Sequence, residues 1–478
     1  MNSKHSLVRR LGLFTAVTIV IGSMIGSGIF KKSASMSGEL GAPGIILGIW
    51  LVAGIISLIG ALTNAEVAGI LPRAGGQYVY FREMYGDFTA YLYGWAIFAV
   101  IQTGSIASIA YVFSGYFEYF YPAPHLSPGW EAWGFSLKWG EQVILDLYPL
   151  KDIGLKLLTV CLIMFLSTVN FFGVAFGGVV QNVFTVLKNV AIAFIVVLAL
   201  VSGAGSVANF SPFVNSAFQY PSGSLIGGIV LALSGAFWAY DGWNNITYLG
   251  GEVKDAQKNI PKAMIFGMFF VIAVYLLVNL AYFYILPADV MKDSSFLAAD
   301  VMKRSVGEWG GAFVAIAVLV STFGTTNGTI LVSARVYYAM AKDGLFFKKL
   351  EDVHHKYKTP GTSLLIQGLW ASLITMTGTF DQLTDMLIFV SWIFYGMGAY
   401  GVFVLRKKMP NADRPYKAFG YPVLPAFFVI FSAFFVGFSI WYNVRNAVFG
   451  ILLVAIGIPL YFYFRKTKGD DEAKAERG

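Results

Sequence analysis

Charged side chains are scarce in this chain of 478 residues, because Asp, Glu, Lys and Arg together make up only 13% of it. Soluble globular proteins carry about 25% charged residues. Apolar residues reach 57%, and the mean hydropathy is +0.67. This composition excludes a soluble enzyme, a disordered scaffold and a secreted module. It leaves a polytopic membrane protein, because apolar runs of about 20 residues recur along nearly the whole length.

Cysteine and histidine are also rare. The single cysteine, Cys161, cannot form an internal disulfide and is expected to face lipid or to pack within an apolar run. The four histidines, His5, His125, His354 and His355, all lie outside the apolar runs. HExxH, P-loop and DxxD motifs are absent as well, so the sequence indicates neither a membrane-embedded enzyme nor a bound cofactor or metal.

Twelve predominantly apolar runs of about 18 to 30 residues predict twelve transmembrane helices. No small-residue cleavage site follows the basic residues 1–10, so the first run is expected to stay in the protein. The predicted spans are 11–33, 43–70, 88–118, 155–175, 178–202, 225–252, 262–286, 309–342, 361–378, 383–406, 421–442 and 444–464. The long connections 121–150 and 202–223 are expected to be external loops with an interfacial segment.

Lysine and arginine are distributed unequally between the two sides that these spans define. With the N-terminus in the cytoplasm, 23 of the 34 Lys and Arg residues lie on the cytoplasmic side and 9 lie outside, and Lys188 and Arg335 lie within spans. The positive-inside rule therefore predicts that both termini are cytoplasmic. The same sorting accounts for the net charge of +8, so the expected surroundings are the bilayer of the cell membrane and not nucleic acid.

Two apolar runs contain clusters of glycine and polar residues at mid-membrane depth, at residues 22–28 and 234–245. The second cluster includes Asp241, Asn244 and Asn245. Helices that break inside a membrane expose backbone groups that are tolerated only around a cavity, and two such helices are typical of transporters. One cluster alone could equally serve close helix packing. A channel is harder to exclude, but no span carries a charged ring or a filter sequence.

The clusters and several further motifs resemble the amino acid–polyamine–organocation superfamily and, within it, prokaryotic exchangers of alanine, serine and threonine from the L-type amino acid transporter family. The two central motifs are Gly22-Ser-Met-Ile-Gly-Ser-Gly-Ile-Phe30 and Trp238-Ala-Tyr-Asp-Gly-Trp-Asn244. The further matches are Leu71-Pro-Arg-Ala-Gly-Gly-Gln-Tyr-Val-Tyr80, Gln181-x3-Thr185-x2-Lys188, Ser321-Thr-Phe-Gly-Thr-Thr-Asn-Gly328, Ser333-Ala-Arg335 and Arg414-Pro-Tyr-Lys417.

The resemblance covers residues 8–465 and implies an all-α polytopic membrane protein with 12 transmembrane helices. It implies a LeuT-like five-plus-five inverted repeat in which helices 1 and 6 are broken at mid-membrane, with two appended helices. The implied regions are a cytoplasmic N-terminus at 1–10, a first repeat at 11–202, a second repeat at 225–406, the appended helices at 421–464 and a cytoplasmic tail at 465–478.

The resemblance also implies a substrate site built largely from backbone atoms at the two breaks. The half-helix that begins near Ser27 would bind the α-carboxylate of an amino acid, and carbonyl groups before each break would bind the α-ammonium. Trp238 would close over the substrate as an aromatic gate. The candidate substrate-binding residues are Ile21, Gly22, Met24, Gly26, Ser27, Gly28, Phe237, Trp238, Tyr240 and Asp241.

Several of these residues have a simpler structural interpretation. Tyr240 and Trp243 are expected to serve packing, and Trp238 could do so too. Asp241 could bind a cationic substrate or cap an exposed half-helix. For Glu66 and Arg335, near the ends of spans, a structural ion pair or a contact at a cytoplasmic gate is favoured over substrate contact.

Lys188 is the most informative ionisable residue, because it lies about 16 Å into the fifth span when counted from Gly177 at about 1.5 Å per residue. Burial of a lysine there is costly unless it is paired or hydrated, and snorkelling is difficult. Since related folds often hold sodium between helices 1 and 8, we expect its ammonium to replace that cation. Its expected partners are carbonyls near Gly22 and the hydroxyls of Ser321 and Thr322. Proton coupling at Lys188 is the main rival.

The sequence therefore predicts a sodium-independent exchanger of L-amino acids that works by alternating access. Small neutral amino acids are the expected substrates, because the bulky Trp238 narrows the cavity. The alternative within the same superfamily is a proton-coupled or cationic amino acid or polyamine transporter. Residues 121–150 contain no cysteine, unlike the loop by which eukaryotic members bind a heavy subunit. A monomer without a disulfide-linked partner is therefore expected.

Overall fold

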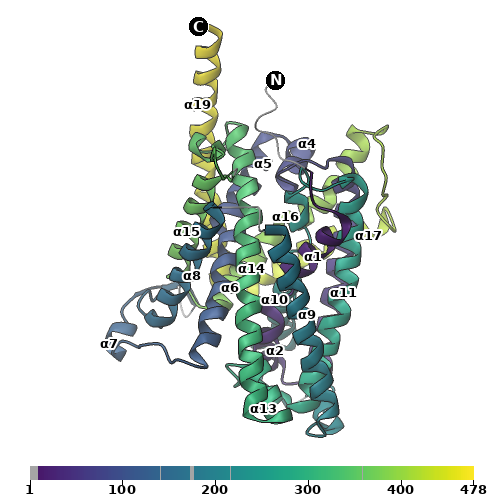
Figure 1. The fold of residues 1–478 in the computed structure, drawn as a ribbon, viewed down its shortest axis with the longest axis vertical. Coiled ribbons are helices and arrows are strands. Elements are labelled where there is room, and N and C mark those ends of the chain that lie inside the picture. Colours follow the sequence, from purple (N-terminus) through teal and green to yellow (C-terminus); the bar gives the residue numbers. More distant parts are fainter. Residues whose placement is uncertain (1–8, 140–141, 173–176, 216, 358, 478) are drawn as a thin grey trace.

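Apolar helices make up most of the chain (Figure 1). The computed structural model describes residues 9–477 except 140–141, 173–176, 216 and 358. Within these residues, ten helical stretches are long and apolar enough to cross a membrane. The predicted spans 225–252 and 361–378 contain shorter helices, α10 (Leu225–Tyr240) and α15 (Gly361–Thr375). The prediction of an all-helical polytopic membrane protein is confirmed, whereas the number twelve stays a prediction.

Most of the other α-helices overlap the predicted spans. These other α-helices are α1 (Leu13–Met24), α2 (Gly28–Leu40), α3 (Pro43–Ile70), α4 (Gln77–Tyr85), α5 (Asp87–Ala96), α6 (Gln102–Glu118), α7 (Pro128–Glu131), α8 (Ile153–Phe172), α9 (Gly177–Val201), α11 (Ala256–Ile285), α12 (Ala288–Met291), α13 (Leu297–Val306), α14 (Glu308–Lys342), α16 (Phe380–Lys408), α17 (Val423–Tyr442), α18 (Val444–Ala455) and α19 (Gly457–Arg477). Of these, α4, α7, α12 and α13 lie in the connections between the predicted spans. A π-helix, η2 (Ile97–Ile101), joins α5 to α6, and short 3₁₀ helices are η3 (Val207–Phe210), η4 (Asn245–Tyr248) and η5 (Lys348–Glu351).

Local sequence signals explain several helix ends. Gly41 ends α2 in the left-handed conformation, with φ +57°, and Pro43 occupies the first turn of α3. Thr379 and Gln382 form a capping box at the start of α16. These local signals determine where α2 ends and where α3 and α16 begin. Packing between helices then determines how the helices are oriented.

The connection between α6 and α8 contains one small sheet besides α7. Strands β1 (Phe135–Trp139) and β2 (Gln142–Leu147) pair antiparallel with Phe135 opposite Leu147. The sequence predicted an interfacial segment in this connection but no strands. The available signal was the alternation of apolar and polar residues in Phe135–Trp139, which is typical of a strand but extends over only five residues.

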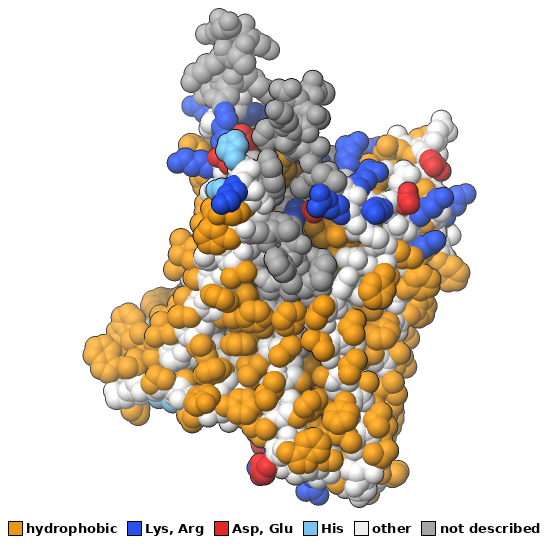
Figure 2. All heavy atoms as spheres, in the orientation of Figure 1, with side chains coloured by type: hydrophobic (Ala, Val, Ile, Leu, Met, Phe, Trp, Pro, Cys, Tyr) orange, Lys and Arg blue, Asp and Glu red, His pale blue; other side chains and the backbone are white. Residues whose placement is uncertain are grey.

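Apolar side chains cover the face of the bundle between its two ends, and Lys and Arg gather at one end (Figure 2). Large apolar side chains that are more than half exposed occur on most of the long helices. Examples are Phe165, Val197, Phe266, Leu369 and Phe434. A surface of this kind is stable against lipid and not against water. The helix α4 and the final turns of α19 lie at the same end, opposite α13 (Figure 1).

The interrupted helices lie in the interior of this bundle. α2 packs on α10, and α1 packs on α9, α11 and α14. α6 packs on α14 and on α16. These neighbouring helices cover the ends of α1 and α10 and shield their backbone groups from lipid.

Candidate functional site

The first predicted span is broken between α1 and α2. α1 ends at Met24, Ile25 is extended with φ −74° and ψ 92°, and α2 begins at Gly28. Glycine and serine are poor helix formers, so residues 22–28 favour an interruption here. No side chain caps the start of α2. The break and its position agree with the sequence prediction.

The second break directly follows α10 and touches the first. Asp241 is extended with φ −67° and ψ 152°, and Gly242 has φ +102°, a conformation that favours glycine. A Cβ atom on Gly242 would lie 3.1 Å from the backbone of Ser23. A Cβ atom on Gly28 would lie 2.6 Å from Cα of Ala239. The two interrupted helices therefore approach each other as closely as backbones can.

A small cavity lies where the two breaks meet, and its accessible volume of about 20 Å³ is room for about one water molecule. This volume is far below the range of about 300–1,000 Å³ for ligand pockets, so an amino acid would fit only when the surrounding helices move apart. Six of the candidate substrate-binding residues line the cavity, namely Met24, Gly26, Ser27, Gly28, Trp238 and Asp241. The other lining residues are Ser23, Gln102, Ser105, Ile109, Gly242, Asn245 and Thr329.

Four candidate substrate-binding residues lie outside the cavity lining: Ile21, Gly22, Phe237 and Tyr240. The Phe237 ring packs on Trp392 with the ring centroids 4.0 Å apart. The Tyr240 hydroxyl donates a hydrogen bond to the Trp50 carbonyl at 3.1 Å. These contacts support the shape of the break, as the packing interpretation of Tyr240 anticipated.

Three helix ends converge on the cavity. The N-terminus of α2 carries a partial positive charge, and the C-termini of α1 and α10 carry partial negative charges. A zwitterion with one carboxylate and one ammonium group matches this arrangement, because each of its charges meets a helix end of the opposite sign. The amine and carboxylate of any α-amino acid would be recognised in the same way.

Two polar side-chain atoms at the cavity are buried without a hydrogen-bond partner among the described residues. They are Oγ of Ser27 and Nε1 of Trp238. A buried polar group without a partner costs about 1–3 kcal/mol. Both residues line the cavity, so a polar ligand bound there could satisfy them.

Tyr275 of α11 links the two breaks. Its hydroxyl lies 2.8 Å from the carbonyl oxygens of both Met24 and Ala239. These carbonyls belong to the last turns of α1 and α10, where the helix leaves them without backbone partners. Tyr275 therefore fixes the distance between the two helix ends that frame the cavity.

Trp238 is covered on one side by the start of α16. Its ring packs edge to face on Phe380, with the centroids 6.2 Å apart. Beside it, Nζ of Lys32 forms an ion pair of 2.6 Å with Asp381 and a hydrogen bond of 2.7 Å with Thr384. Lys32 is 2% exposed. These contacts join α2 to α16 next to the cavity.

Asp241 lies in the cavity wall as a buried carboxylate. It accepts a hydrogen bond of 2.5 Å from the Tyr395 hydroxyl. Among the described residues, no Lys or Arg forms an ion pair with it. Its position at the end of α10 fits a structural role, and its place in the lining fits contact with a positively charged substrate group.

Lys188 of α9 reaches the end of α1. Its Nζ atom donates hydrogen bonds to the Gly22 carbonyl at 2.7 Å, to the Ile25 carbonyl, and to Oγ1 of Thr325 at 3.1 Å. The side chain is 4% exposed. The predicted contact with carbonyls at the end of the first half-helix is therefore present, and Lys188 does not snorkel.

The predicted hydroxyl partners of Lys188 are different from those in the structure. Thr325 contacts the ammonium, whereas Thr322 bonds to the Val318 carbonyl at 2.7 Å and Oγ of Ser321 has no partner among the described residues. Ser321 and Thr325 are one helical turn apart on the same face of α14. The sequence indicated the correct face but the wrong turn, because it does not determine how far α14 slides along α1.

Glu66 and Arg335 form ion pairs away from the cavity. Glu66 is 1% exposed and accepts hydrogen bonds from Arg406 at 2.7 Å, from Arg414 at 3.2 Å and from the Ala418 N–H at 2.7 Å. Arg335 pairs with Glu252 at 3.2 Å. Neither residue lines the cavity, in agreement with the interpretation as ion pairs.

The sequence analysis missed Gln102, Ser105, Ile109 and Thr329 in the lining, whereas Asn245 belongs to the second cluster that it identified. Gln102 directly follows the π-helix η2 and donates a hydrogen bond of 3.1 Å to the Asn245 side chain. Single π-helical turns often occur at functional sites. The available signal was a polar Gln inside an otherwise apolar span, which is costly in a membrane unless the residue is buried in protein.

Comparison with known proteins places the chain in a family. Residues 11–461 match the family described as amino acid permease. The chain is 31% identical to the serine/threonine exchanger SteT of Bacillus subtilis (strain 168), with 97% of this chain and 98% of that protein covered. It is also 31% identical to the human b(0,+)-type amino acid transporter 1 and to the mouse large neutral amino acids transporter small subunit 2. In both cases 96% of this chain is covered, with 88% and 81% of the relative.

Proposed function

This chain belongs to the amino acid permease family, and we propose that it is a sodium-independent exchanger of small neutral L-amino acids that works by alternating access. The chain is an amino acid antiporter and a multi-pass membrane protein, not an enzyme. The proposal adds the class of substrate and the absence of sodium coupling. It also assigns the substrate to the cavity between the two broken helices.

The observation that carries the proposal is the convergence of three helix ends on one small cavity. One end is positive and two are negative, which complements the charges common to all α-amino acids. The lining is mainly backbone and small side chains, with Ser27 and Trp238 each offering an unpaired polar atom. The bulky Trp238 ring in the lining narrows the cavity, which favours a substrate with a small side chain.

The contacts of Lys188 support transport without sodium. Its ammonium carries one positive charge and donates to the oxygens of Gly22, Ile25 and Thr325. A cation held there by a covalent side chain cannot leave with the substrate. It stabilises the end of α1 without adding the energy of an ion gradient, so the expected reaction is exchange of one amino acid for another.

Exchange in proteoliposomes tests the proposal. Vesicles that contain the purified protein would be preloaded with alanine, leucine, arginine or no amino acid, and uptake of each radiolabelled amino acid would be measured with and without a sodium gradient. We expect rapid alanine uptake only into vesicles preloaded with a small neutral amino acid, at a rate independent of sodium. Uptake that requires sodium or a proton gradient, or uptake into empty vesicles, would contradict exchange.

Asp241 favours one second candidate, which is exchange of cationic amino acids. Its carboxylate lines the cavity and has no Lys or Arg partner among the described residues. If it binds a cationic side chain, Asp241→Asn abolishes arginine uptake and spares alanine uptake. If wild-type vesicles take up alanine and no arginine, the carboxylate has the structural role instead.

The proposal includes the arrangement in the membrane. We propose twelve spans on the basis of the twelve apolar runs, and both termini in the cytoplasm on the basis of the excess of Lys and Arg on one side. In support, Figure 2 shows Lys and Arg gathered at one end of the face in view. We further propose that the protein acts as a monomer without a disulfide-linked heavy subunit, since residues 121–150 contain no cysteine and Cys161 lies within α8.

A further inference from the structure

The connection between α6 and α8 brings together three residues that are well separated in sequence. His125 lies in the segment after α6, Glu131 is the last residue of α7, and Asp152 directly precedes α8. A Cβ atom on Gly154 would overlap the Pro124 carbonyl oxygen, so glycine at this position allows the segment that carries His125 to lie against the start of α8.

The segment before Asp152 is fixed as well. Nζ of Lys156 donates hydrogen bonds to the carbonyl oxygens of Tyr148 at 2.9 Å and Pro149 at 3.3 Å. Lys156 is 3% exposed. The Asp152 carboxylate is therefore presented from a turn that is tied to α8, and not from a free loop.

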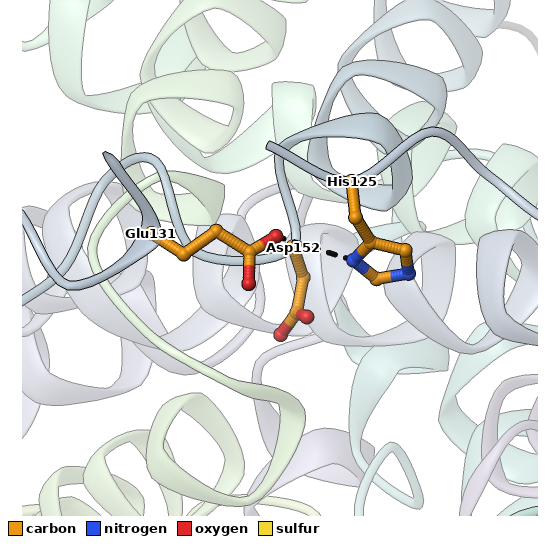
Figure 3. A group of neighbouring side chains, drawn as sticks. All are labelled: His125, Glu131 and Asp152. Atoms are coloured by element: carbon orange, nitrogen blue, oxygen red, sulfur yellow. Dashed lines mark hydrogen bonds and ion pairs between the residues drawn. The ribbon is translucent and has the colours of Figure 1, made fainter. Parts of the chain in front are cut away.

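The side chains of His125, Glu131 and Asp152 face one another (Figure 3). Nδ1 of His125 lies 3.2 Å from Oε1 of Glu131, and one donor atom from each of the three residues lies within 4.8 Å of the other two. Two ligands at about 2.0–2.1 Å from a tetrahedral zinc ion are about 3.3–3.4 Å apart. The His125–Glu131 separation is close to that spacing, and the Asp152 carboxylate lies within 4.8 Å of both ligand atoms.

In the described part of the chain, the carboxylates of the cluster have no direct lysine or arginine partner. Among the described residues, no Lys or Arg forms an ion pair with Glu131 or Asp152. Lys151 and Lys156 lie near this turn, but the ammonium of Lys156 donates to the two carbonyls. Glu118, at the end of α6, adds a third carboxylate that interacts electrostatically with His125, Asp152 and Lys31. The oxygens of Glu131 and Asp152 are therefore available to a bound cation.

We propose that His125, Glu131 and Asp152 form a binding site for a divalent transition-metal ion, with Zn²⁺ as the best fit. An imidazole nitrogen with two carboxylates is a donor set that zinc accepts, and three protein ligands leave a fourth position for water. The bound ion would link the end of α6, α7 and the start of α8, so it would hold the connection in one conformation. The site is separate from the cavity between the broken helices.

Metal titration of the full-length protein in detergent tests this site. The protein would be stripped with a chelator, freed of it, and titrated with ZnCl₂ by calorimetry, while thermal unfolding is followed with and without Zn²⁺. We expect one Zn²⁺ per chain and a higher Tm with the ion, because a ligand that binds only the folded state stabilises it. His125→Ala and Asp152→Asn should each weaken binding by roughly tenfold or more.

The matched control is His355→Ala, which removes another exposed histidine outside the helices and should leave zinc binding unchanged. Because the His125 side chain is 59% exposed, His125→Ala is expected to fold, and its Tm without zinc verifies this. Binding of equal strength in the wild type, His125→Ala and Asp152→Asn would overturn the site. Absence of zinc binding to the wild type would do so too and would leave only a surface ion pair between His125 and Glu131.

Discussion

At the scale of single residues, Lys188 is the side chain whose role can be tested most directly, because it is buried and has three oxygen partners. Its ammonium contacts the Gly22 and Ile25 carbonyls at the end of α1 and Thr325 of α14. The lysine therefore contacts the end of α1, whereas a bound carboxylate would contact the start of α2.

We predict that Lys188→Met reduces exchange by roughly tenfold or more. The substitution leaves buried carbonyl and hydroxyl oxygens without a donor, and each such group costs about 1–3 kcal/mol. A factor of ten corresponds to about 1.4 kcal/mol. Exchange in proteoliposomes, normalised to the amount of folded protein, measures this. Lys156→Met is the control, because Lys156 is also buried and bonded to carbonyls but lies away from the cavity. Normal exchange by folded Lys188→Met protein would disprove the role.

Trp238 offers a second prediction at this scale. Its ring lines the cavity and packs on Phe380, so it can block a narrow path while it contacts the substrate. Trp238→Ala should strongly impair exchange without loss of expression, and Trp238→Phe should retain a larger part of it. Near-normal exchange by folded Trp238→Ala protein would reduce this residue to ordinary packing.

At the scale of elements, two ion-pair clusters join helices, one beside the cavity and one away from it, and each contains a buried charged side chain. Lys32 and Asp381 connect α2 to α16 next to Trp238. Glu66 connects α3 to the end of α16 and to the segment before α17, through Arg406, Arg414 and the Ala418 N–H. Alternating access requires contacts beside the cavity, such as the Lys32–Asp381 pair, to open. The Glu66 cluster has several partners, so we expect it to act as a joint, that is, a connection that stays intact during transport.

Glu66→Ala should lower the stability of the protein by about 3–5 kcal/mol, which is the usual cost of breaking a buried ion pair from one side. Here two buried or half-buried arginines would lose their carboxylate. Thermal unfolding in detergent measures the effect. Glu83→Ala provides the comparison, because the Arg73–Glu83 pair is exposed and should contribute no more than about 1 kcal/mol. Equal effects of the two substitutions would show that the Glu66 cluster is not a joint.

At the scale of the whole molecule, the orientation in the membrane is the property to test. The excess of Lys and Arg at one side predicts that residues 121–150 are external. In a Cys161→Ser background, a cysteine at the exposed Ser136 should react with an impermeant thiol reagent in intact cells. A cysteine at the exposed His355 should react only after the membrane is opened. The reverse pattern would invert the topology.

The sequence alone determined the class of protein, the positions of the long helices and the two breaks. Burial of helical backbone in lipid needs long apolar runs, and glycine with serine weakens a helix wherever they cluster, so both features are local in the sequence. The family motifs added the expected site at the breaks. Met24, Gly26, Ser27, Gly28, Trp238 and Asp241 were identified in this way and line the cavity.

Only the tertiary structure decided which other residues meet at the site. Gln102 and Thr329 reach the cavity, and Thr325 contacts Lys188 in place of Ser321 and Thr322. The sequence could not assign these contacts, because lipid is as apolar as the protein interior and hydropathy does not show which face of a membrane helix points inward. The rotation and axial position of α6 and α14 are fixed by packing against their neighbours, which is a property of the assembled bundle.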